Sequence, residues 1–156
     1  MNEYLVIKYI HILSASILFG TGIGIAFFKW VTDRSRDNRV IRIVTERTVL
    51  ADWIFTTPAI GLQLITGLRL AYLAGYPILT GWVFYALCLF ILAGCCWLPV
   101  VWFQMRMRDI AIAADNGHSQ LPDRYWEYTR VWFWLGVPAF LALTVVYWLM
   151  VYKPAL

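Results

Sequence analysis

Four long apolar runs constrain the fold of this chain more than any other sequence feature. They cover residues of about 4–30, 49–74, 82–105 and 126–152. Each run exceeds the ~20 residues that a helix needs to cross ~30 Å of hydrocarbon. Because lipid offers no partner to backbone N–H and C=O groups, spanning segments of this kind must be helical. The sequence therefore predicts an all-α integral membrane four-helix bundle, formed by a single transmembrane domain over residues 1–156.

The composition excludes the soluble classes of protein. Hydrophobic residues make up 62% of the chain and charged residues 14%, whereas ordinary soluble domains have about 45–50% and about 25%. A soluble domain of this length would have to expose a large share of its residues to water. We therefore exclude a soluble enzyme, a disordered tail and a collagen-like chain.

The basic residues predict how the spans are oriented. Two polar linkers, 31–48 and 106–125, contrast with the short uncharged turn at 75–81. Ten of the thirteen Lys and Arg residues lie in or beside the two long linkers: Lys29, Arg34, Arg36, Arg39, Arg42, Arg47, Arg106, Arg108, Arg124 and Arg130. The positive-inside rule then places both linkers in the cytoplasm. We expect an up-down-up-down, multi-pass protein of the bacterial inner membrane, with both termini outside. The net charge of +4 reports this topology and no nucleic-acid partner.

The linkers and the glycines carry further expectations. Val40, Ile41 and Ile43 interrupt the arginines of the first linker, which is typical of an amphipathic extension. The second linker is predicted to be a solvated connection with a turn at residues 115–117. Gly20 and Gly24 have the small-xxx-small spacing that favours close helix packing.

Ionisable side chains inside the first span are candidates for a function, because such groups are costly in a membrane and face the bundle interior. Lys8 and His11 are three residues apart and share a helix face. His11 is the one histidine within a span, since His118 lies in the second linker. It lies about six residues outward of the span's centre, or roughly 9 Å.

A polar stripe runs along the second span. Its members follow one another at steps of three and four residues: Asp52, Thr56, Ala59, Gln63 and Thr66. The plain interpretation of the threonines and the glutamine is that they join helices through hydrogen bonds. Arg69 continues the stripe to the outward depth of His11, so that Lys8, His11 and Arg69 are predicted to line one pocket. Asp52 belongs at the cytoplasmic end.

This set of residues suits a b-type haem. His11 supplies an axial metal ligand, aromatic side chains supply apolar walls, and Lys8 with Arg69 supply cations for the propionates. With one intramembrane histidine, the second axial position is open or is completed by a methionine or a partner group. The sequence therefore suggests an inner-membrane haem protein with a redox or haem-handling role.

Other interpretations stay open at this point. Lys8 and Arg69 have the length to snorkel to the interface, His11 suits a buried hydrogen-bonding role, and Asp52 suits an ion pair with a linker arginine. The whole protein is also compatible with a cofactor-free accessory or assembly subunit of a larger membrane complex, or with a homo-oligomer. A small-solute or metal transporter is disfavoured by the lack of an internal repeat.

Residues 4–13, with the sequence YLVIKYIHIL, followed by Gly20, resemble the first helix of the domain of unknown function 2269 family of small bacterial membrane proteins. Further likenesses are Thr57-Pro58 through Thr66-Gly67, Gly81-Trp82 and Lys153-Pro154, so that the resemblance covers nearly the whole chain. The chain is more distantly similar to the haem-binding membrane protoporphyrinogen oxidases and to the copper-resistance D proteins. There the Lys-x-x-His element is the specific part, and it implies that His11 is a haem ligand.

Three departures separate the chain from the oxidases. Trp82 is followed by Val83-Phe84-Tyr85-Ala86 where the oxidases carry a lysine. Leu135-Gly136 stands where they have an Asn-Glu pair, and residues 24–26 lack their arginine. The resemblance therefore implies the histidine-bearing scaffold and leaves enzyme activity open.

Overall fold

A computed structural model describes residues 2–154, and these residues form helices and no strand. The helices are α1 (Glu3–Ser35), α2 (Asn38–Ala51), α3 (Thr57–Leu73), α4 (Gly81–Asn116) and α5 (Asp123–Tyr152). A single π-helical turn, η1 (Asp52–Thr56), joins α2 to α3 without a break, so that the chain forms four long helical segments. All four have the length and hydropathy of a membrane span. The prediction of an all-α protein with four spans is confirmed.

The π turn has a local cause in Pro58. Proline donates no backbone hydrogen bond, and its ring collides with the carbonyl group four residues earlier. The helix widens there, and the N–H of Thr57 bonds to the carbonyl of Asp52, five residues back. The hydroxyl of Thr57 donates to the same carbonyl oxygen at 2.9 Å. The wide turn therefore leaves one helical rod, with its buried polar stripe intact.

Both long linkers are mostly helical. In the first, only Arg36 and Asp37 interrupt the helices: Arg36 has a left-handed backbone (φ 57°), and Asp37 caps α2. Here the expected amphipathic extension is confirmed, with Ile41 fully buried. The prediction that the second linker is a solvated connection is wrong for residues 106–116, which are helical. Met107, Ala111 and Ala114 are buried at helical spacing, and their packing extends α4 to Asn116.

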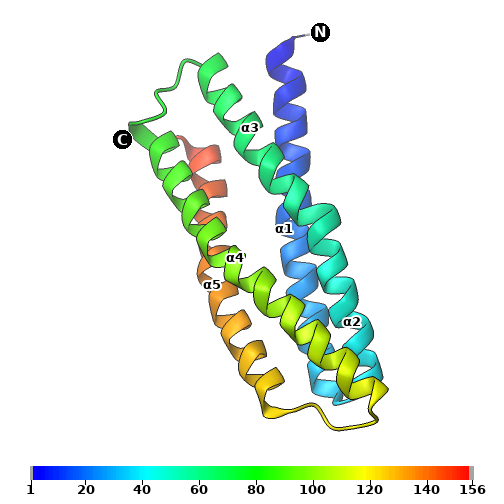
Figure 1. Cartoon of the computed structure of the whole chain (residues 1–156). Coiled ribbons are helices and arrows are strands. Elements are labelled where there is room, and N and C mark those ends of the chain that lie inside the picture. The colour runs from blue at the N-terminus through cyan, green and yellow to red at the C-terminus, as the bar shows by residue number, and fades with distance from the viewer. Residues whose placement is uncertain (1, 155–156) are drawn as a thin grey trace.

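The helices form two pairs that meet at one end of the bundle and diverge at the other (Figure 1). One pair is α1 with the α2–η1–α3 rod, and the other is α4 with α5. The end away from the termini is closed, because α4 packs on α2 around a core that includes Ile41, Met107 and Tyr125. At the terminal end the smaller cluster of Ala86, Val146 and Leu149 joins only α4 and α5.

The outer surface of the bundle is apolar. In each span, only 17–33% of the most hydrophobic 18-residue window is buried within the protein. The remaining side chains face outward, as lipid-facing residues do. Gly20 and Gly24 belong to this surface, since a Cβ atom at either would meet nothing within 4 Å. The prediction that they mediate close helix packing is therefore wrong for the chain on its own.

Candidate functional site

His11 of α1 is buried against α3 and held in one orientation. Its Nδ1 atom lies 2.7 Å from the hydroxyl oxygen of Thr66. That hydroxyl already donates its single hydrogen to the carbonyl of Leu62 in its own helix, so it accepts from the imidazole. Nδ1 therefore carries the ring proton, and Nε2 has a free lone pair. A partner on one ring nitrogen that fixes the tautomer is the arrangement found at histidine metal ligands.

Three further residues fix the position of the imidazole. The Gln63 amide nitrogen lies 2.5 Å from the carbonyl oxygen of His11 and 2.7 Å from the hydroxyl of Ser14. Gly67 lies against the ring, where a Cβ atom would come within 3.2 Å of Cε1. The predicted role of Gln63 and Thr66 in joining helices is confirmed. His11 is thus positioned between two turns of α3.

A cavity of about 490 Å³ adjoins His11 at the terminal end of the bundle, between the two diverging pairs. Its volume falls within the ~300–1,000 Å³ typical of small-molecule and cofactor sites. Most of its walls are apolar or aromatic, and they include Ile12, Leu64, Leu87, Phe90, Val146 and Tyr147. Among residues 2–154, Nε2 of His11 has no hydrogen-bond partner, and it is not sealed from the cavity.

Cations lie at the rim of this cavity. Lys8 lines it beside Tyr4, with the ammonium 5.8 Å from the ring centroid. Lys153 lines it beside Tyr76 at the same distance. The predicted juxtaposition of Lys8 and His11 is present. In the sequence, Lys153 is marked only by the family resemblance, because its place beside the cavity depends on the return of α5 to this end.

Arg69 does not line the cavity, and its predicted place in a pocket with Lys8 and His11 is wrong. Arg69 follows Thr66 by three residues, which places it about 60° around the helix axis from Thr66 and off the buried face. There Arg69 donates two hydrogen bonds to Glu3, at 2.6 and 2.9 Å. Both side chains of this pair are about half exposed.

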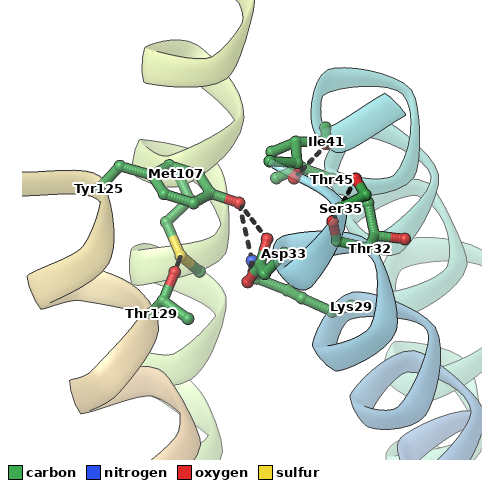
Figure 2. Close-up of polar contacts among 9 residues, drawn as sticks. All are labelled: Lys29, Thr32, Asp33, Ser35, Ile41, Thr45, Met107, Tyr125 and Thr129. Carbon is green, nitrogen blue, oxygen red and sulfur yellow. Dashed lines mark hydrogen bonds and ion pairs between the residues drawn. The ribbon is translucent and has the colours of Figure 1, made fainter. Parts of the chain in front are cut away.

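A second buried polar cluster lies toward the closed end, and sequence reasoning missed it (Figure 2). Lys29 of α1 donates to Asp33 at 2.8 Å and to the hydroxyl of Tyr125 in α5 at 2.9 Å. Tyr125 in turn donates to the other oxygen of Asp33 at 2.8 Å. Lys29 is 1% exposed, Asp33 8% and Tyr125 not at all. The only signal in the sequence was the four-residue spacing of Lys29 and Asp33.

Asp52, at the π turn, is buried without a cationic partner in the described part of the chain. Its carboxylate accepts from the Thr56 hydroxyl at 2.6 Å within the same helical rod, so the prediction that Thr56 joins two helices is wrong. The predicted ion pair with a linker arginine is therefore wrong. Arg34 and Arg36 stack instead on the rings of Trp30 and Trp126, at 3.8 and 4.0 Å.

Residues 2–154 contain no group of three His, Cys, Asp or Glu side chains that is close enough to hold a metal ion. A multi-ligand metal centre made from these side chains is therefore absent from that range. A single histidine beside a large apolar cavity instead suits a metal that brings its own organic ligands.

One sequence comparison bears on this chain. The profile of a family described as "Predicted integral membrane protein (DUF2269)" matches residues 5–154, from the first turn of α1 past the end of α5. No curated protein and no solved structure matches. The resemblance to that family is therefore confirmed. The more distant likeness to the oxidases and the copper-resistance D proteins stays a prediction.

Proposed function

This chain belongs to the DUF2269 family of predicted integral membrane proteins, and we propose that it binds a b-type haem in the cavity beside His11. The observation that carries the proposal is the free Nε2 atom of a tautomer-fixed histidine at the wall of a cofactor-sized cavity. The proposed role is redox or haem-handling. Bound haem supplies an iron that changes oxidation state or takes a further ligand.

The residues present fit such a group. His11 would hold the iron through Nε2, with Thr66 fixing the ring from the other side. Lys8 and Lys153 would meet the propionates at the cavity rim. Arg69 would contribute only by exchanging Glu3 for a propionate, since it now pairs with that residue. Met150 also lines the cavity, and its thioether would be the second protein group available to hold the iron.

An absorption spectrum of the protein tests the proposal directly. The protein is purified in mild detergent from haem-replete cells, and oxidised and dithionite-reduced spectra are recorded with a pyridine haemochrome count per chain. We expect a Soret band at near-stoichiometric haem. A colourless preparation with full helical content would overturn the proposal and favour the cofactor-free accessory subunit.

We further propose that the protein lies in the bacterial inner membrane, with both termini outside. Figure 1 shows the α1–α2 and α4–α5 connections together at the end of the bundle away from the termini. Ten of the thirteen basic residues lie in or beside the two linkers that hold these connections. The positive-inside rule makes this end cytoplasmic.

Cysteine accessibility tests this orientation. In a variant whose native cysteines are replaced by alanine, Ser119→Cys is expected to react with a membrane-impermeant maleimide only after the cells are opened. Leu79→Cys, at a position that is 78% exposed in the α3–α4 connection, is expected to react in intact cells. The two sites control for each other, and the reverse labelling pattern would contradict the proposed topology.

A further inference from the structure

Two arginines and two aromatic rings form a compact group on the α4–α5 pair, near the closed end of the bundle. Trp102 and Arg106 are one turn apart on α4, and Tyr128 and Arg124 are one turn apart on α5. The ring centroids of Trp102 and Tyr128 are 5.8 Å apart. Because the two helices run in opposite directions (Figure 1), both arginines lie one turn beyond the rings toward the closed end.

The two guanidinium groups have no carboxylate partner. Arg106 lies 5.4 Å from the centre of the Trp102 ring, and Arg124 lies 5.2 Å from that of Tyr128. Both side chains are exposed, and neither forms an ion pair with any residue in the range 2–154. Arg108 differs, because it pairs with Asp109 at 2.8 Å. Arg124 also donates from Nε to the Tyr128 hydroxyl at 2.7 Å. Each guanidinium therefore lies at its own ring, and neither charge is neutralised by a carboxylate of residues 2–154.

The surface next to this group changes from apolar to cationic within two helical turns. Leu98 is 65% exposed, Trp102 is 42% exposed, and Arg106 follows at the same four-residue spacing on one face of α4. Tryptophan and tyrosine rings favour the headgroup level of a bilayer. From Leu98 to Arg106, this face therefore presents an apolar side chain, an aromatic ring and a cation in the order of the acyl chain, interface and headgroup of a lipid.

We propose that Arg106 and Arg124 bind the phosphate of an anionic phospholipid, with Trp102 and Tyr128 beneath the headgroup and the acyl chains along Leu98. A planar guanidinium presents paired donors that fit phosphate oxygens. The adjoining apolar stripe favours a lipid over a soluble phosphate as the source of this anion. The site is separate from the cavity at His11 and does not depend on haem.

Lipid titration of the purified full-length protein, read by native mass spectrometry, tests the site. Phosphatidylglycerol is compared with phosphatidylcholine for the wild type and for R106Q, R124Q and the double variant. Each basic residue near a charged bilayer contributes an amount equivalent to about five-fold in affinity. We expect each single variant to weaken phosphatidylglycerol binding about five-fold and the double variant about 25-fold.

R108Q is the matched control, because it removes the same charge from the same helix but from a paired arginine. We expect its affinity to stay within about two-fold of the wild type. An equal loss in R108Q, equal binding of the two lipids by the wild type, or displacement of the lipid by inorganic phosphate would each overturn the proposal.

The R106K/R124K variant keeps the test decisive if a glutamine variant does not fold. It retains both charges but loses the planar paired donors. We expect a several-fold loss of phosphatidylglycerol binding with unchanged helical content. Wild-type affinity in this variant would overturn the assignment of the phosphate to these two guanidiniums.

Discussion

Replacing His11 with alanine is expected to leave the purified protein without haem and with its helical content largely intact. His11 is the histidine that lines the cavity, and the other histidine of the chain, His118, does not line it, so no other imidazole can replace it. The four spans do not depend on it, because their burial and hydropathy are spread over the whole bundle. The measurement is the pyridine haemochrome count per chain, with circular dichroism of the same sample.

Two variants make this experiment specific. His118→Ala removes the other histidine, which lies in the α4–α5 connection, and is expected to leave the haem count unchanged. Thr66→Val removes the acceptor of the Nδ1 proton, and loss of such an outer partner typically weakens metal binding about 10- to 100-fold. Unchanged haem in the His11 variant would refute the ligand assignment.

The sequence predicted those parts of the fold that depend on a local period. Hydropathy located all four spans, and the three- and four-residue steps of the stripe from Asp52 to Thr66 correctly identified a buried face. The prediction of a solvated second linker was wrong, because the few small and apolar residues of this segment, such as Ala111 and Ala114, are sufficient to pack α4 on α2. The average composition of such a segment is polar even when one narrow face of its helix is buried.

Pairings between distant helices were beyond sequence reasoning. Tyr125 is 92 residues from Asp33, and Arg69 is 66 residues from Glu3. Each contact depends on the rotation of a helix about its axis, which packing sets and hydropathy does not. The cavity likewise depends on two helix pairs diverging, a feature that no single segment encodes. His11 was accessible to prediction only because an imidazole is rare inside a span.

The triad of Lys29, Asp33 and Tyr125 connects the two helix pairs at the closed end. It joins α1 to α5, which are otherwise in little contact, and it lies among the core residues around Met107. The cavity at the other end lies between the same two pairs. These buried, directional bonds thus add to the packing of α4 on α2, which closes the end of the bundle away from His11.

Lys29→Met is expected to destabilise the protein by about 3–5 kcal/mol, the cost of leaving one charge of a buried pair without its partner. Among its present partners, the carboxylate of Asp33 would keep only the Tyr125 hydroxyl as a donor, in a site that is largely buried. The measurement is the free energy of unfolding in mixed detergent micelles. Glu3→Gln is the control, because it breaks a half-exposed pair with Arg69 and is expected to cost at most about 1 kcal/mol.

The double variant Lys29→Met/Asp33→Leu separates the charge from the packing. With both charges removed, only the Tyr125 hydroxyl remains as a polar group of the triad. Exchanging a buried ion pair for apolar side chains is often neutral or stabilising by about 1–4 kcal/mol. We therefore expect the double variant to regain most of the stability that Lys29→Met loses, with Tyr125 keeping its place in the core. A Lys29→Met cost no larger than that of Glu3→Gln would show that the triad does not hold the closed end. If the double variant is as unstable as Lys29→Met, the packing of the lysine side chain, rather than its charge, stabilises the closed end.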